Sequence, residues 1–192
     1  MINREQAFSI VNHYIKNPHL VNHMLAVEAT MAFYAEKLNQ PFTTWQITGL
    51  LHDFDWEIHP TKEQHPSDGG PILREQGVSE EIIHAILTHG DHLNLPRVNL
   101  LEKALYACDE ITGLVTAVAL VRPSKSLYDL ESSSVKKKWK DKTFAAGADR
   151  NAIEKGAVEF GVPLWEHCDN VIHAMREIAP QLGLVGTVIA TT

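Results

Sequence analysis

The stretch GLLHDFD at residues 49–55 decides how this chain is interpreted, because it places His52 and Asp53 side by side after Gly-Leu-Leu. The preceding apolar residues indicate a buried helix, and an ionised aspartate is costly to bury unless it is paired or bound to a metal. An imidazole beside a carboxylate supplies donors that Zn, Fe, Mn and Ni sites favour. An HD dipeptide alone occurs by chance in many proteins, but this setting predicts a metal site at the end of a buried helix.

Other polar residues interrupt apolar helical segments on both sides of this pair. His23 lies on an apolar helical face, and Asp109 falls within the run ALYACDEITGLV. His89 ends the run IIHAILTH, and His65 opens HPSDGGPIL just before a predicted helix. Each of these residues alone is more often a core histidine or a capping acid. Together they predict a metal centre, with the candidate ligands His23, His52, Asp53, His65, His89 and Asp109.

Helical periodicity and helix-end signals account for nearly the whole chain. No strand-pairing signal, repeat or long linker is present. We therefore predict an all-α fold, a helical bundle formed by a single domain over residues 1–185, with a short β-prone tail at 186–192. The predicted helices cover 3–16, 19–39, a segment capped by Thr43 or Thr44 that runs through Phe54, 68–76, 80–89, 100–121 with an Asn99–Glu102 capping box, 134–142, Asp149 to Phe160, and Pro163 to about 183.

Composition excludes several classes of protein. The 192 residues suffice for one domain with a substantial core. The net charge of −7 argues against nonspecific nucleic-acid binding by the whole surface. Cys108 and Cys168 form no CxxC motif, so neither a disulfide framework nor a cysteine zinc site is expected. The first residues have no apolar segment of the kind a signal peptide needs, and no stretch approaches the roughly 18 apolar residues of a membrane span. These features predict a cytoplasmic protein without a membrane partner.

The order of the candidate ligands resembles the signature of a known family. His23, then His52-Asp53, then Asp109 resembles the H…HD…D pattern of the HD superfamily of metal-dependent phosphohydrolases. The words HMLAVEATM, GLLHDFD and EKALYACDEITGL around these residues match as well, over about residues 20–115. The remainder looks like uncharacterised bacterial HD hydrolases of the HDIG type.

The resemblance implies a helical bundle that holds one or two divalent transition metals (Fe, Mn, Zn, Co or Ni). His23, His52, Asp53 and Asp109 would hold the first metal. The interposed His65 and His89 resemble the longer form found in dinuclear members, in which Asp53 would bridge to a second metal. The family often has a further ligand just after the last of these histidines, where this chain has Gly90, Asp91 and His92. Asp91, His92 or water is left open at that position.

The same resemblance implies hydrolysis of a phosphate ester or nucleotide through a metal-bound hydroxide, with a small phosphorylated substrate. Asp53 would act at the metals, and Asp55, Glu57 or His92 would donate a proton or orient a ligand, although each of these three is more often structural. One alternative is a di-iron oxygenase of the myo-inositol-oxygenase type, which the same ligands would serve. The other is a non-catalytic metal-binding regulatory module, against which the intact ligand set counts.

Basic residues near the end of the 100–121 helix suggest a substrate clamp. Arg122 and Lys125 can hold a substrate phosphate, or they can simply favour a helix C-terminus. The basic run KKKWKDK at 136–142 is interpreted as a solvated helix face, so a nucleic-acid partner is not expected. The long apolar helices are compatible with a homodimer. The remaining internal histidines show no partner pattern and are interpreted as surface or core residues: His13, His59, His84, His167 and His173.

Overall fold

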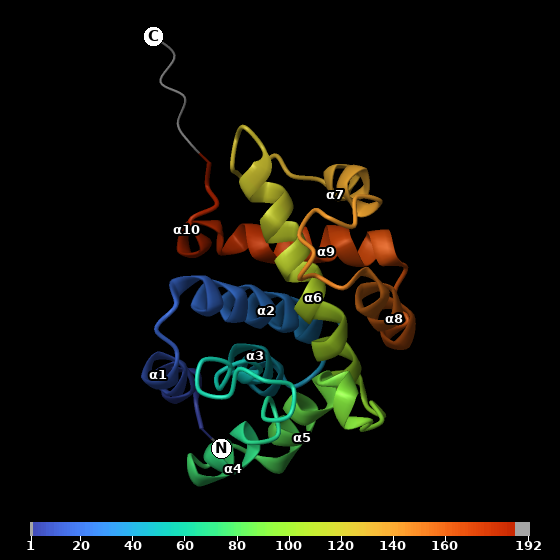
Figure 1. Ribbon diagram of the computed structural model, residues 1–192. Coiled ribbons are helices and arrows are strands. Elements are labelled where there is room, and N and C mark those ends of the chain that lie inside the picture. Colours follow the sequence, from blue (N-terminus) through green and yellow to red (C-terminus); the bar gives the residue numbers. More distant parts are fainter. Residues whose placement is uncertain (1, 187–192) are drawn as a thin grey trace. The chain divides into compact units, whose positions relative to one another are not determined.

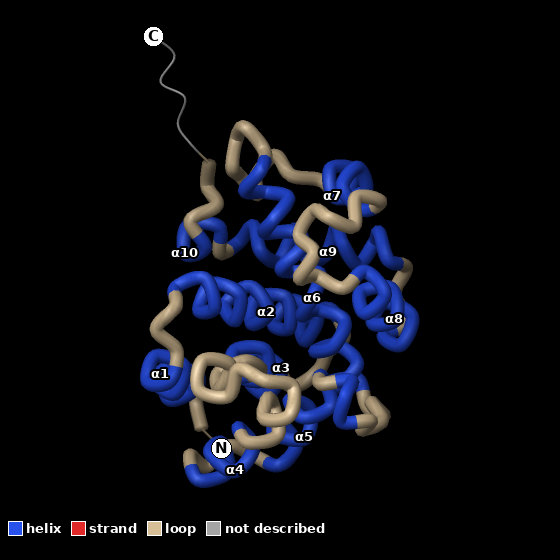
Figure 2. The backbone as a smooth tube through the Cα atoms, viewed as in Figure 1, coloured by secondary structure: helices blue, strands red, loops and turns tan. Residues whose placement is uncertain are grey.

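The structure is a computed structural model that describes residues 2–186, and its regular elements in that range are helices (Figures 1 and 2). An isolated antiparallel bridge pairs Ser126 with Val185. The prediction of an all-α fold is confirmed for this part of the chain. The predicted tail at 186–192 lies, apart from Gly186, outside the described residues.

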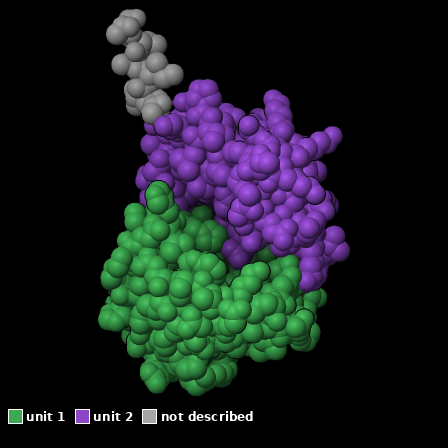
Figure 3. Space-filling view, in the orientation of Figure 1, with its two compact units in different colours: residues 1–106 green, residues 107–192 purple. Residues whose placement is uncertain are grey.

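The chain divides into two compact units, Met1–Tyr106 and Ala107–Thr192 (Figure 3). We call them unit 1 and unit 2 and describe each by itself. The boundary falls inside α6 (Leu100–Val121), which passes from one unit to the other without a break. The expectation of a single domain over residues 1–185 stays a prediction.

Unit 1 is arranged around α3, which packs against three other helices of the unit, α1, α2 and α5. Four of its side chains, Trp45, Ile47, Leu50 and Leu51, are at most 2% exposed, so α3 forms the centre of the apolar core. Because His52 and Asp53 follow α3 directly, the position of this core helix fixes the position of both residues. The helices of unit 1 are α1 (Arg4–Tyr14), α2 (Pro18–Lys37), α3 (Phe42–Leu51), α4 (Gly69–Glu75), α5 (Glu80–His89) and the short 3₁₀ helix η1 (Asp91–Leu93).

A glycine lets α3 approach α2 closely. A Cβ atom at Gly49 would lie 2.9 Å from the carbonyl oxygen of Val27 and 3.0 Å from the Cα of Glu28. Those neighbours are backbone atoms of α2 and cannot turn aside as a side chain can. Gly49 therefore sets the separation between the helix that carries His23 and the helix that ends at His52.

Unit 2 contains the second part of α6 and four further helices. α9 packs against α7 and α8, and its residues Val171, Ile172 and Met175 are buried. The imidazole of the buried His167 on α9 hydrogen-bonds through Nε2 to the carbonyl oxygen of Ala107, at 2.8 Å. The four helices are α7 (Ser132–Trp139), α8 (Arg150–Phe160), α9 (Leu164–Glu177) and α10 (Ala179–Leu182).

Helix ends follow the predicted capping residues at several positions. Asn99 Oδ1 accepts from the backbone N–H of Glu102 at 3.0 Å, and Glu102 Oε2 accepts from the N–H of Asn99 at 3.1 Å, which is the predicted capping box. Asp149 accepts from the N–H of Asn151 and caps α8.

Several predicted helix ends are wrong. The third helix ends at Leu51 and not at Phe54, and the basic helix predicted at 134–142 runs from Ser132 to Trp139. The third helix begins at Phe42 after Pro41, with no side-chain cap, so neither Thr43 nor Thr44 is its N-cap. The last predicted helix ends at Glu177, and a separate α10 follows that has Pro180 in its first turn. Proline cannot continue a preceding helix, because it lacks the N–H donor and disfavours the α conformation of the residue before it.

Among the described residues, α6 is the one helix that is long and apolar enough to cross a membrane, with a mean hydropathy of 1.6 over its most apolar window. The expectation that no stretch approaches a membrane span is therefore wrong as regards length and composition. However, 61% of that window is buried inside the protein, as in the core helix of a soluble protein. The helix is weak evidence for a membrane partner.

Candidate metal centre

His52 is held in one orientation by the turn of helix that precedes it. Its side chain is completely buried, and its Nδ1 lies 2.8 Å from the carbonyl oxygen of Gly49. A carbonyl oxygen can only accept, so Nδ1 carries the proton and donates it. When the imidazole is neutral, the other ring nitrogen, Nε2, is the acceptor atom, and this is the form of imidazole that binds metals.

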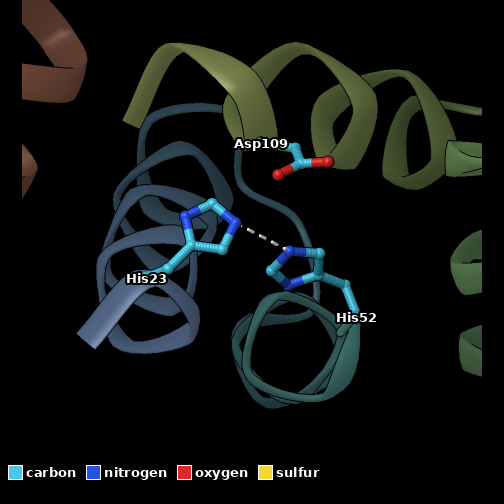
Figure 4. Close-up of side chains that lie close together, drawn as sticks. All are labelled: His23, His52 and Asp109. Atoms are coloured by element: carbon cyan, nitrogen blue, oxygen red, sulfur yellow. Dashed lines mark hydrogen bonds between the residues drawn. The ribbon is translucent and has the colours of Figure 1, made fainter. Parts of the chain in front are cut away.

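His23 on α2 meets His52 from the neighbouring helix. Figure 4 shows the two rings with their Nε2 atoms joined by a dashed line, and these atoms lie 3.2 Å apart. The ring centroids are 5.0 Å apart with an edge-on arrangement. Two imidazole nitrogens from different helices thus converge on one point.

A second histidine pair is built in the same way. His65 follows the turns after α3, His89 is the last residue of α5, and their Nε2 atoms lie 3.1 Å apart. The Nδ1 of His89 donates to the carbonyl oxygen of Ile86, whereas the Nδ1 of His65 donates to Oδ1 of Asp55 at 2.8 Å. Both side chains are almost fully buried, with 6% and 7% exposed for His65 and His89.

Asp53 lies between the two pairs and presents one oxygen to each. Its Oδ2 is 3.5 Å from His52 Nε2 and 3.8 Å from His23 Nε2. Its Oδ1 is 3.2 Å from His65 Nε2 and 3.5 Å from His89 Nε2. The structure therefore brings five of the six predicted ligands together within unit 1, around a carboxylate placed as a bridge.

The charge state of the cluster follows from these contacts. Burial raises the pKa of Asp53, but the charge of His52 and hydrogen bonds from His52, His65 and His89 hold that pKa well below its usual range. Burial lowers the pKa of His65, but its contacts with Asp53 and Asp55 outweigh burial and raise that pKa to about 9. Asp53 is thus an ionised carboxylate in a setting that favours positive charge beside it.

The spacing of the donors fits a metal ion. Two nitrogen ligands about 2.1 Å from one metal, at angles between tetrahedral and octahedral values, lie about 3.0–3.4 Å apart. The Nε2 separations of 3.2 Å and 3.1 Å fall in that range. Imidazole and carboxylate donors together suit Mn, Fe, Co, Ni or Zn. The residues present therefore fit a transition metal at each histidine pair.

The sixth predicted ligand, Asp109, lies on α6. It is half-buried and stands three residues beyond Tyr106, the last residue of unit 1. Figure 4 draws its side chain on that helix. Burial, and then the charge of Asp109, raise the pKa of the neighbouring Cys108 thiol well above its ordinary value. The assignment of Asp109 as a ligand is a proposal, which is argued below.

Asp55, one of the predicted catalytic residues, does not face the converging Nε2 atoms. Its carboxylate is bound by His65 through Oδ1 at 2.8 Å and by His59 through Oδ2 at 3.2 Å. His59 therefore has a partner, contrary to the sequence interpretation. The i, i+4 spacing of Asp55 and His59 was a signal that could have indicated this pair.

The other predicted proton donors have different surroundings. Glu57 accepts from the backbone N–H groups of Lys16 at 3.0 Å and Asn17 at 2.6 Å, so it ties its loop to the chain before α2. His92 is exposed on η1. The carboxylate of Asp91 binds Arg97 at 2.8 Å and the Tyr106 hydroxyl at 2.7 Å, so it is already engaged away from the histidine pairs. The role of His92 stays a prediction.

Arg122 and Lys125 are not brought to the candidate ligand on α6. An α-helix rises about 1.5 Å per residue, so the stretch of α6 from Asp109 to Val121 is about 18 Å long. The Arg122 guanidinium donates to Ser134 Oγ at 2.7 Å and to the Asp129 carboxylate at 2.7 Å, which closes the loop after the helix. The phosphate clamp stays a prediction that this geometry does not favour.

Comparison with known proteins agrees with the site. The model of the HD domain family matches residues 20–114. Ribonuclease Y of Nitratidesulfovibrio vulgaris (strain DP4) is 29% identical over 135 residues, which cover 68% of this chain and 26% of that protein. Ribonuclease Y of Oleidesulfovibrio alaskensis is 27% identical over 135 residues, again 68% of this chain and 26% of the relative. The chain thus spans about a quarter of the length of these relatives. No solved structure matches it.

The matched residues contain all six predicted ligands, from His23 through His52, Asp53, His65 and His89 to Asp109. Through residues 20–114, the chain therefore belongs to the HD domain family of metal-dependent hydrolases.

Proposed function

We propose that this protein is a metal-dependent phosphohydrolase that cleaves a phosphate ester, nucleotides included. The observation that carries the proposal is the position of Asp53, with one carboxylate oxygen toward His23 and His52 and the other toward His65 and His89. A bridging carboxylate between two sets of nitrogen donors is the arrangement of two-metal phosphoryl-transfer sites.

When bound, divalent metals lower the pKa of a coordinated water and offset the charge of phosphate oxygens. The chain's own residues hold and orient these ions. His52 and His89 are fixed through Nδ1 by main-chain carbonyl oxygens, and His65 by a carboxylate, so the three rings are already oriented for binding. Such preorganisation is what a transition-metal site needs for affinity and for catalysis.

We propose Asp109 as a further ligand on the side of His23 and His52. Two facts support this. The order His23, His52-Asp53, Asp109 resembles the family signature, and the family model matches the residues that contain it. Asp109 also continues the unbroken helix α6, whose first residues belong to unit 1, one turn after Leu105 and Tyr106.

Ribonucleic acid is one candidate within this substrate class. The relatives from Nitratidesulfovibrio and Oleidesulfovibrio are named Ribonuclease Y, and a phosphodiester of RNA is a phosphate ester. The chain corresponds to 26% of their length, so their activity enters only as a proposal. A small phosphorylated substrate, a cytoplasmic location and a homodimer likewise stay proposals from the sequence.

The experiment compares hydrolysis and oxygen chemistry on the same preparation. Protein purified without oxygen is analysed for metals and then assayed with p-nitrophenyl phosphate, bis-p-nitrophenyl phosphate, nucleotides and a short RNA. Oxygen consumption is followed in parallel. We expect phosphate-ester cleavage that depends on Mn²⁺, Fe²⁺ or Co²⁺ and is abolished by EDTA and by Asp53→Asn.

Other outcomes identify the alternatives. Iron-dependent oxygen uptake without phosphate release would favour a di-iron oxygenase, since the same imidazole and carboxylate donors suit iron. Bound metal with neither reaction would favour a regulatory module. A protein that takes up no metal at all would contradict all three assignments.

A further inference from the structure

A buried carboxylate outside the bridging position supports only one of the two histidine pairs. The side chain of Asp55 is 1% exposed and lies between two imidazoles. Its Oδ1 accepts from Nδ1 of His65 at 2.8 Å, and its Oδ2 accepts from Nδ1 of His59 at 3.2 Å. Because both oxygens are engaged and the group is enclosed, the carboxylate has a single position.

His52 of the first pair and His65 of the second pair are oriented by different chemistry. On the first pair, His52 donates through Nδ1 to the neutral carbonyl oxygen of Gly49. On the second pair, His89 also donates to a carbonyl oxygen, but His65 donates to an anionic carboxylate. A hydrogen bond from imidazole to a carboxylate makes the opposite nitrogen a stronger metal donor and fixes the ring.

A glycine provides the space for this carboxylate. A Cβ atom at Gly69, the first residue of α4, would lie 2.6 Å from Asp55 Oδ2 and 2.7 Å from Asp55 Cγ. No real Cβ contact is that short, so any other residue at 69 would displace the carboxylate from His65 and His59. At the adjacent Gly70 the nearest atoms to such a Cβ are 3.7 Å and 3.8 Å away, which is ordinary van der Waals contact.

We propose that Asp55, held by His59 and given room by Gly69, is the positioning residue of His65 and sets the metal affinity of the His65–His89 pair separately from that of the His23–His52 pair. The inference shares the metal centre of the proposed function, but it does not depend on the reaction that the centre catalyses. The chain thus has a mononuclear and a dinuclear state, and Asp55 determines the metal concentration at which one becomes the other.

The test is a calorimetric titration of metal-free protein with Mn²⁺, with the bound metal counted by elemental analysis. The wild-type chain is expected to take up two ions. In Asp55→Asn, which keeps the size of the side chain but removes its charge, one of the two binding steps is expected to weaken by roughly 10–100-fold while the other is unchanged.

Two glycine variants form a matched pair. Gly69→Ala removes no polar group but displaces the Asp55 carboxylate, so we expect it to weaken the same single step. Gly70→Ala adds the same methyl group one residue later without a short contact, so we expect wild-type binding of both ions. Glu57→Gln is a second control, since that nearby carboxylate binds the amides of Lys16 and Asn17 instead of a histidine of the cluster.

Far-ultraviolet circular dichroism will show whether Asp55→Asn folds. If it does not fold, the less disruptive variant His59→Leu tests the same proposal. His59→Leu removes one of the two partners of the carboxylate at a side chain that is 18% exposed. It is expected to weaken the same step by a smaller factor.

Equal weakening of both steps, or of neither, would overturn the proposal, and so would a wild-type chain that binds a single Mn²⁺. A single ion would leave hydrolysis by a mononuclear centre open, so the proposed function would survive that result. Conversely, a selective loss of one step in a protein that cleaves no phosphate ester would retain this inference and reject the proposed function.

Discussion

At the scale of single residues, Asp53 and Asp55 have different contacts within the candidate metal centre. Asp53 faces both imidazole pairs, whereas the Asp55 carboxylate accepts from His65 and His59. The same side-chain type thus lies between the two pairs in one case and contacts a single member of one pair in the other, because the chain turns between them after α3 ends.

Asp53→Asn is expected to abolish metal binding at both pairs. The amide removes the negative charge that offsets two divalent ions, and it presents an N–H₂ group to one of the pairs in place of an oxygen. The expected metal content, measured by elemental analysis after dialysis, falls from about two ions per chain to none. Retention of one ion would show that Asp53 does not bridge.

The buried His167 makes unit 2 sensitive to acid. Burial lowers the pKa of His167 below its ordinary value, although its contact with the carbonyl of Ala107 partly opposes this. Below about pH 6.5 the unfolded chain binds a proton that the folded chain still excludes, so the free energy of unfolding falls as the pH falls. Above that pH the two states bind protons equally at this residue, and its contribution is constant.

His167→Gln keeps a donor that can reach Ala107 but cannot titrate. Urea unfolding at pH 7.5 and at pH 5.5 is expected to show a smaller loss of unfolding free energy on acidification than in the wild-type chain. An equal loss of unfolding free energy in the two chains would contradict the assignment of the acid sensitivity to His167.

At the scale of elements, the geometry of the candidate metal centre depends on the contact between α2 and α3. The carbonyl of Gly49 orients His52, and the missing side chain of the same residue lets α3 lie against α2, which carries His23. One residue therefore positions two ligands, one by a hydrogen bond and one by the separation of two helices.

Gly49→Ala is expected to lower the free energy of unfolding by about 1–3 kcal/mol, the usual cost of inserting a methyl group into a packed contact. It should also weaken metal binding at the His23–His52 pair, because the helices must separate. Urea unfolding and the Mn²⁺ titration measure the two effects. Thr43→Ala, at an exposed position of the same helix, is the control and should change stability by less than about 0.5 kcal/mol.

Elements whose ends are marked by local chemistry were predictable from the sequence. The capping box at Asn99 and Glu102 and the Asp149 cap need only neighbouring residues to form, and both are present. The beginning of α3 was mispredicted because Thr43 and Thr44 are acceptable caps locally, whereas the helix begins at Phe42, two residues before Thr44, without a side-chain cap.

In the candidate site too, features marked by the local sequence were predictable, whereas contacts between distant residues were not. An order of histidines and aspartates on apolar helices was enough to predict which residues gather around Asp53. Asp55 was predicted to donate a proton or to orient a ligand, but the ligand that it contacts was not predictable, because His65 and Gly69 are ten or more residues away and only folding brings them together. Arg122 was assigned to a substrate from its charge, but its charge is used by Asp129 within its own loop.

At the scale of the whole molecule, metal binding should appear as stability. A ligand that binds only the folded chain stabilises it by about 2.7 kcal/mol at a concentration of 100 Kd. For a chain of this size that corresponds to a rise in Tm of roughly 5–10 °C. Differential scanning fluorimetry with Mn²⁺ and with EDTA measures this rise in Tm. Asp53→Asn should have the same Tm in the two conditions. An equal shift in that variant would place the metal elsewhere.

The loop after α3 is anchored at both ends, by Glu57 to the amides of Lys16 and Asn17 and by His65 to Asp55. Residues 60–63 between these anchors are exposed. Lengthening a flexible loop is cheap, at about 0.6 kcal/mol for each doubling, and neither anchor would need to move. This short stretch is therefore where insertions can accumulate during evolution, or be made in the laboratory, to vary what reaches the metals while the ligands stay in place.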